Sequence, residues 1–141
     1  MSYSLSFSKA ILVVIFISDK IRQGQFEFLS TKTISEILNI PKPTLVKIMQ
    51  NLTAAGIIET KEGKSGGIRL RKQPSEISIL DILNATEGGK PLFQTNFNIL
   101  AEGKRPDNAQ KSIENVLLDA ESKMHHSLSK KTIAQILTDM D

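Results

Sequence analysis

The 141-residue sequence contains no cysteine. It therefore cannot form a disulfide, a thiolate zinc site or a cysteine-ligated iron–sulfur cluster. Long hydrophobic runs are also missing, because the apolar run from Ala10 to Ile17 is far too short to cross a bilayer. Charged residues follow this run directly and no small-residue cleavage site does, so we expect no signal peptide and no membrane partner. A cysteine-free chain suits the reducing cytosol, and we expect a cytoplasmic protein.

Catalytic groupings are missing as well. No Ser/His/Asp arrangement and no pair of carboxylates stands out, which argues against an enzyme. The two histidines, His125 and His126, are adjacent and point about 100° apart on a helix, so they do not share a metal ion. We interpret them as exposed helix residues and leave open a bridging role across a dimer. The sequence predicts no cofactor and no metal site.

The modest net charge of +3 is unevenly distributed. Between Pro41 and Lys72, seven basic residues accompany two acidic ones, a local charge of +5, while the remainder of the chain has −2. Such a basic segment is typical of a surface that faces phosphate groups. A solvated basic face is the alternative interpretation.

The residues from 33 to 70 follow the order of a winged helix-turn-helix. A short helix, capped by Ser30 or Thr33, repeats apolar residues at i, i+3 and i+4. Pro41 and Pro43 suit the first turn of a second helix, which ends near Gly56. We expect this second helix to bury one apolar face: Leu45, Ile48, Met49 and Leu52.

Two short strands, 57–61 and 68–71, follow as a predicted hairpin. Glycines between them permit positive φ angles and close backbone approach: Gly63, Gly66 and Gly67. The connection does not match a Walker A motif, because no Lys-Ser/Thr pair after the last glycine opens a helix. Lys64 at the tip is instead a candidate contact to phosphate or to the minor groove of DNA.

The rest of the chain predicts a helix, an irregular segment and a long helix. Ser78 and Asp81 form a capping box for a helix that ends at Gly88. Residues 90–107 are irregular, with Phe93, Phe97, Ile99 and Leu100 as apolar anchors. From Asn108 we expect a long helix whose apolar stripe requires a partner surface: Ile113, Val116, Leu117, Ala120, Met124 and Leu128. A last helix is expected after Ser129.

Three motifs resemble the Rrf2 (Rrf-two) family of bacterial winged-helix transcription regulators. They are Ile40-Pro-Lys-Pro-Thr-Leu-Val-Lys-Ile-Met-Gln-Asn-Leu52, Gly63-Lys-Ser-Gly-Gly-Ile-Arg-Leu70, and Pro74-Ser-Glu-Ile-Ser-Ile-Leu-Asp-Ile-Leu83 followed by Glu87-Gly88. The resemblance covers residues 4–88 well and the long helix more loosely. It implies a homodimer held by crossed long helices, which reads a two-fold-related DNA operator.

By position, the resemblance places the DNA-reading surface on the second helix and the wing: Lys42, Thr44, Val46, Lys47, Gln50, Lys61, Lys64 and Ser65. An exposed Val46 suits contact with a thymine methyl group, although single exposed valines are also common on any surface. This chain departs from the pattern of the family at two places. Cluster-binding members have three cysteines in the segment that corresponds to 90–107, and many members have arginine where this chain has Glu62.

We therefore predict a mainly α (α+β) fold in three parts: a winged helix-turn-helix DNA-binding domain at 1–88, an effector or linker segment at 89–107, and dimerisation helices at 108–141. The predicted function is a homodimeric repressor that binds double-stranded DNA at a palindromic operator. The alternative is a winged helix that docks a protein partner and does not bind DNA. An effector, either a small molecule or a protein, is expected near Phe93, Phe97 and Leu100.

Overall fold

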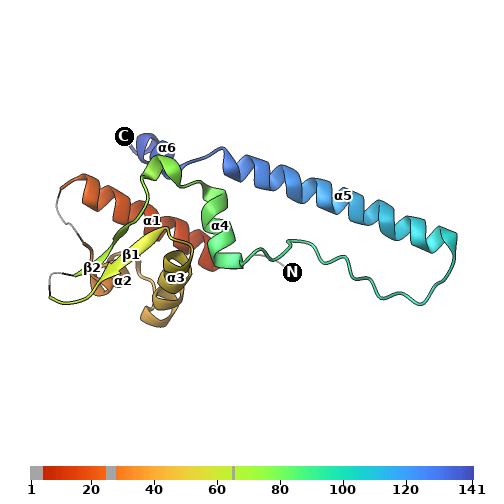
Figure 1. The fold of residues 1–141 in the computed structure, drawn as a ribbon, viewed down its shortest axis with the longest axis horizontal. Coiled ribbons are helices and arrows are strands. Elements are labelled where there is room, and N and C mark those ends of the chain that lie inside the picture. Colours follow the sequence, from red (N-terminus) through yellow and green to blue (C-terminus); the bar gives the residue numbers. More distant parts are fainter. Residues whose placement is uncertain (1–4, 25–27, 65) are drawn as a thin grey trace.

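A computed structural model describes residues 5–24, 28–64 and 66–141 (Figure 1). The helices and strands follow in the order α1 (Leu5–Arg22), α2 (Thr31–Leu38), α3 (Lys42–Ala54), β1 (Ile58–Lys61), β2 (Gly67–Leu70), η1 (Pro74–Glu76), α4 (Ile79–Glu87), α5 (Lys104–Ser129) and α6 (Ile133–Asp139). The mainly helical fold with one small antiparallel sheet confirms the predicted fold class. Within the described ranges, no helix is both long and apolar enough to cross a membrane.

Helix α1 crosses the middle of the body and forms the centre of the core. One face of the helix is removed from solvent: Ala10, Val13, Val14 and Ile17. The helix packs against α2, α3, α4, α6 and β2. These neighbours account for only part of its continuous apolar sequence, because Leu5 and Leu12 are 66% and 53% exposed.

The turn between α2 and α3 is fixed by local hydrogen bonds. Ser30 caps α2 by accepting a hydrogen bond from the backbone N–H of Thr33 at 3.1 Å. Asn39 then adopts the left-handed conformation with φ 53°, and the hydroxyl of Ser35 donates to the carbonyl of Ile40 at 2.7 Å. Pro41 stands at the N-cap of α3. The two helices are therefore joined by a turn with little freedom.

The wing is a two-stranded hairpin that is attached to the segment before α2. Ile58 to Lys61 pairs with Gly67 to Leu70. Leu29 joins the edge of the hairpin through two backbone hydrogen bonds to Ile68, at 2.9 and 2.7 Å. Gly67 is required here, because a Cβ atom at this position would run into the backbone carbonyl of Leu29.

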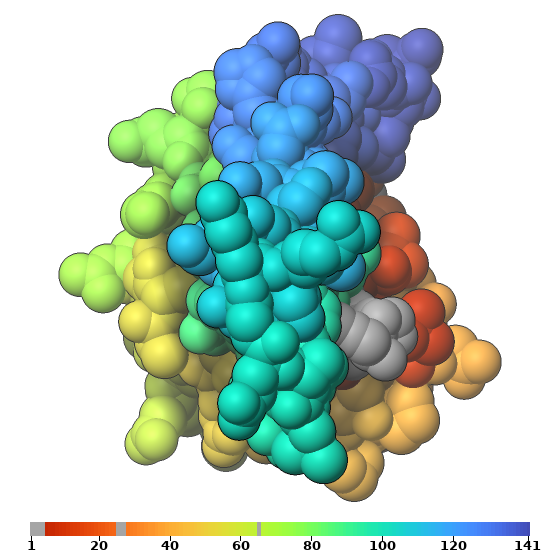
Figure 2. All heavy atoms as spheres, turned by 90° about the vertical axis from the view of Figure 1, so that its right-hand side faces the viewer, coloured from red at the N-terminus to blue at the C-terminus, as the bar shows by residue number. Residues whose placement is uncertain are grey.

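The C-terminal part returns to the body after a long excursion. Residues 89–103 run outward from α4, and α5 comes back towards α6 (Figure 1). Figure 2 views this arm end-on, with the start of α5 standing in front of the body. Ile79 N–H donates to Lys131 and Ile133 N–H donates to Ile77, both at 2.9 Å. These bonds join the start of α4 to the start of α6.

Two predicted helix boundaries are wrong. The long helix begins at Lys104, four residues before Asn108, because the N-cap Gly103 breaks the chain direction at φ 116° and Pro106 fits the first turn. The last helix is capped by Thr132 and not by Ser129, which is still part of α5. The Thr132 side chain accepts from the N–H of Gln135 at 3.2 Å, as part of a capping box.

Replacement of Gly67 by alanine is expected to lower the free energy of unfolding by about 1–3 kcal/mol, because Leu29 or the hairpin must shift. Chemical denaturation measures this loss. Gly63→Ala is the matched control, since Gly63 also has a positive φ but open space around its Cβ direction. A loss at Gly67 no greater than that at Gly63 would contradict the close approach.

Candidate nucleic-acid interface

The outer face of α3 is exposed and has charged, polar and apolar side chains. Leu45, Ile48 and Leu52 are buried beneath it. Five of the residues predicted to read DNA lie on or beside the outer face: Lys42, Val46, Lys47 and Gln50 are exposed, and Thr44 is half-buried. The i, i+3, i+4 spacing that buries one side of the helix therefore leaves these side chains together on the other.

A shallow hollow runs along this outer face and reaches the first strand of the wing. Val46, Met49 and Gln50 line it together with Thr60 of β1. Val46 is 42% exposed, and Met49 is half-buried, whereas the sequence placed Met49 on the buried side. Met49 lies at the border of the two faces because it directly follows the fully buried Ile48. The sequence analysis did not place Thr60 at this hollow, because Thr60 comes there only through the packing of β1 beside α3.

The wing presents two of the predicted cations to solvent. Lys61 and Lys64 are both exposed, as is Glu62 between them. Ser65, which was also predicted to contact DNA, lies outside the described residues. The hairpin therefore places positive charge at its tip, partly offset by one glutamate.

An aromatic ring and an ion pair position the wing. The Arg69 guanidinium lies over the Phe28 ring, 4.6 Å from its centroid, and the Lys61 ammonium lies 5.5 Å from the same centroid. Arg69 also pairs with Glu59 across the hairpin, with Nε and Oε1 2.6 Å apart. Sequence reasoning missed these contacts. The sequence did contain a signal for the ion pair, because Glu59 and Arg69 have opposite charges and lie on either side of a glycine-rich turn. The register of the hairpin sets these two residues opposite each other.

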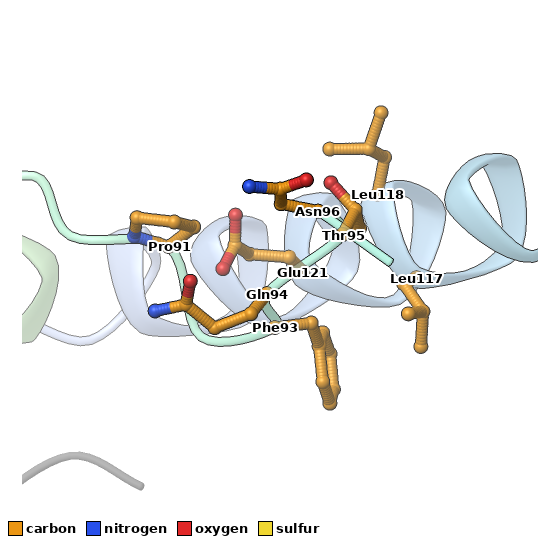
Figure 3. A pocket seen from close by; sticks show the side chains of 8 residues that line it. All are labelled: Pro91, Phe93, Gln94, Thr95, Asn96, Leu117, Leu118 and Glu121. Carbon is orange, nitrogen blue, oxygen red and sulfur yellow. The ribbon is translucent and has the colours of Figure 1, made fainter. Parts of the chain in front are cut away.

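The predicted effector residues are only partly brought together. A hollow of about 230 Å³ lies between residues 91–96 and α5 (Figure 3). Phe93 lines it with Leu117 and Glu121, and the Glu121 carboxylate accepts a hydrogen bond from the backbone N–H of Leu92. Phe97 is half-buried outside the hollow, and Leu100 is 93% exposed.

The predicted stripe on α5 divides along its length. Towards the tip of the arm Ile113, Val116 and Ala120 are exposed. Leu117, Met124 and Leu128 are half-buried, and Leu128 packs on the core. Leu118, which the sequence analysis did not assign to the stripe, is 52% exposed. No residue of α5 is fully buried.

Two charged groups on α5 interact away from this stripe. The Lys123 ammonium lies 2.9 Å from the Asp119 carboxylate, and the hydrogen bond and the negative charge raise the pKa of Lys123. The amine of Lys123 is already protonated at neutral pH, so the raised pKa does not change its charge in the physiological range.

His125 is half-buried beside Glu87 and Glu121, and His126 is exposed. The expected exposure therefore holds for His126 alone.

A helix-turn-helix with an exposed outer face, followed by a hairpin with lysines near its tip, defines a winged-helix DNA-binding protein. The chain belongs to the Rrf2 family: the family model, described as an iron-dependent transcriptional regulator, matches residues 3–139. The resemblance seen in the sequence motifs is thereby confirmed.

Several known proteins are similar to the chain. It is 33% identical over 117 residues to the transcriptional regulator NsrR of Halalkalibacterium halodurans. The matched region covers 79% of this chain and 75% of that protein. It is 36% identical over 72 residues to NsrR of Shouchella clausii, and there it spans about half of the relative's length. These relatives are transcriptional regulators and not enzymes, as expected.

Two solved structures share the fold. CymR, the global cysteine regulator of B. subtilis, superposes with a TM-score of 0.74 at 17% identity, and covers 100% of this chain and 99% of that one. IscR of T. potens superposes with a TM-score of 0.67 at 18% identity, covering 100% of this chain and 89% of that one. At these identities the likeness concerns the fold.

The donor groups of this chain do not fit an iron–sulfur cluster. Such clusters are held by cysteine thiolates, and the sequence has none. Among the described residues, no group of three or more histidine, aspartate or glutamate side chains is placed to hold a metal ion. The iron dependence in the family description therefore has no thiolate ligand in the sequence and no matching group of side chains among the residues that the structure describes.

We expect the purified protein to retain only substoichiometric iron and sulfide after anaerobic reconstitution and desalting, because thiolate ligands are lacking. Elemental iron and acid-labile sulfide analyses measure this. An apo-protein sample of a cysteine-containing family member, treated in parallel, is the positive control. Stoichiometric iron and sulfide bound to this chain would contradict the assignment.

Proposed function

We propose that the chain is a sequence-specific DNA-binding regulator, a homodimeric repressor that occupies a palindromic operator. The observation that supports it most directly is the exposed outer face of α3 beside an exposed, lysine-bearing wing. In winged helices the second helix of the helix-turn-helix enters the major groove. Repression follows from occupancy alone, because a protein bound across a promoter blocks polymerase.

The residues on the outer face divide by chemistry into two roles. Lys42 and Lys47 are suited to phosphate oxygens, as cations at the rim of the helix. Val46 and Gln50 are suited to base edges, since a methyl group packs on thymine and an amide can bond adenine in a bidentate manner. Lys61 and Lys64 extend the cationic surface onto the wing, where the neighbouring backbone lies.

The partner of α5 is proposed to be a second copy of the chain. Ile113 and Val116 expose apolar surface along a helix that has no buried residue of its own. Burial of such a stripe against a two-fold-related copy supplies the hydrophobic free energy that the single chain leaves unused. The 26-residue helix is about 39 Å long, comparable with the roughly 34 Å between half-sites one DNA turn apart.

The signal is proposed to act on residues 89–107, which connect the DNA-binding part (1–88) to the dimerisation helices (108–141). A small molecule or a protein bound near Phe93, Phe97 and Leu100 would favour one orientation of the arm over another. The resulting change in half-site spacing is a shift between two dimer populations. We place this activity in the cytoplasm, where the chromosome is accessible.

Replacement of Lys47 or Lys64 by alanine is expected to weaken binding to DNA from upstream of the protein's own gene. Each change should lower the slope of log affinity against log salt by about one, because one phosphate contact is lost. Gel shifts at several salt concentrations measure both effects. Lys130→Ala, an exposed cation at the end of α5, is the control that should leave binding unchanged.

Binding to that DNA no tighter than to random duplex would contradict the proposal. A stable complex with a protein that covers Lys47 and Gln50, with no affinity for DNA, would instead support the protein-docking alternative.

Replacement of Val116 by glutamate is expected to convert a dimer into a folded monomer. Val116 is 65% exposed in the single chain, so a charge there leaves the protomer intact but is costly inside an apolar interface. Sedimentation velocity measures the mass in solution. Ser122→Glu, on the opposite side of α5, is the matched control, and dissociation by both variants, or by neither, would contradict the assigned face.

A further inference from the structure

A partly open cavity of about 380 Å³ lies between the C-terminal end of α1 and the chain that leaves β2. Ile21 and Arg22 of α1 form one side. Arg69, Leu70 and Lys72 of β2 and the following turn form the other, and Pro74 of η1 closes it. This space, called the basic cavity below, is of the size that small ligands occupy, about 300–1,000 Å³.

Positive charge gathers around the basic cavity. Arg22, Arg69 and Lys72 line it, and no aspartate or glutamate does. Arg22 pairs with Asp19 at 3.2 Å on α1, and the Arg22 side chain remains 47% exposed. Lys72 has no ion pair within the part of the chain that the structure describes, and its side chain is exposed. Two of the three cations are therefore accessible to an anion from solution.

Apolar surface completes the basic cavity. Ile21 and Leu70 are half-buried, and both line the cavity together with Pro74. A bare inorganic anion would leave this surface exposed to water, whereas a wholly apolar molecule would bring no charge to the cations. The lining therefore matches a molecule with both properties.

We propose that the basic cavity binds a small organic anion, with its apolar body on Ile21, Leu70 and Pro74. Its carboxylate or phosphate head lies between Arg22 and Lys72. The guanidinium group of Arg22 matches the two oxygens of such a head with parallel N–H donors, and Lys72 adds a second charge. Because Lys72 is exposed, the head lies at the solvent side of the cavity.

The position of the basic cavity separates it from the proposed DNA-binding surface. Leu70 ends β2 at the base of the hairpin, whereas the wing tip around Lys64 lies at the opposite end of the strands. None of the lining residues belongs to α3. The cavity is also distinct from the hollow beside α5, which is formed by residues 91–96 and three α5 side chains.

Arg69 connects the basic cavity to the wing. Its side chain lines the cavity, pairs with Glu59 of β1 and lies over Phe28, which also faces Lys61. An anion held between Arg22 and Lys72 brings negative charge into the cavity that Arg69 also lines, attracts its guanidinium away from Glu59 and Phe28, and so alters the support of Lys61. This coupling rests on the proposed function, because it changes the affinity for DNA only if the wing contacts DNA.

The experiment uses octanoate and octyl phosphate as probes and octanol as the uncharged control. Ser18 and Gln73 also line the cavity, and their backbone amide shifts and that of Leu70 are followed by NMR during titration of the full chain. We expect saturable shifts with one or both anions and none with octanol. The double variant Arg22→Gln/Lys72→Gln should bind at least about tenfold more weakly, because two charge-assisted contacts are lost. Lys104→Gln/Lys130→Gln, which changes an exposed cation at each end of α5, is the matched control.

Shifts that do not saturate, that occur equally with octanol, or that saturate with unchanged affinity in the Arg22/Lys72 variant overturn the site. Preference between the two probes distinguishes a carboxylate from a phosphate ligand. Gel shifts with and without octanoate test the coupling, and an unchanged affinity at saturating octanoate overturns it. Specific DNA binding without octanoate binding removes the site alone, and octanoate binding without specific DNA binding removes the proposed function alone.

Discussion

The burial of α1 is the constraint on which the other elements depend. Val13, Val14 and Ile17 have no exposed surface, and the helix contacts α3, α4, α6 and β2. Removal of this apolar surface from water is the main favourable contribution to folding, and it fixes α3 and the hairpin relative to each other. The outer face of α3 and the wing can act as one surface because both rest on the same buried helix.

Much of this organisation could be predicted from the sequence, because local signals agreed with the packing. The capping box of Ser78 and Asp81 and the glycine at the end of α4 stand as expected, and on α3 the burial of Leu45, Ile48 and Leu52 does so too, while Met49 does not. The predicted helix boundaries at Asn108 and Ser129 were wrong. The residues around both positions are good helix formers or polar residues, and these occur both inside a helix and just outside it. Capping by Gly103 and Thr132 decided the outcome.

The contacts that position the wing could not be predicted in the same way. Phe28 precedes α2, and it meets Lys61 and Arg69 only because Leu29 pairs with Ile68. The basic cavity likewise combines residues of α1 with residues some fifty positions further along the chain. Periodicity and charge runs describe single elements, and they do not indicate which elements adjoin. Such sites require the fold itself.

The backbone bonds between Ile79 and Lys131, and between Ile133 and Ile77, have a mechanical consequence. They close the chain from α4 to α6 into a loop, and both ends of this loop are attached to the same body, one at α4 and the other at α6. Because both ends of the arm are held on the same body, a force on the arm is passed to α4 and α6 together. In the proposed dimer, a signal that moves the arm would therefore move each DNA-reading surface as one unit with the body to which the arm is attached.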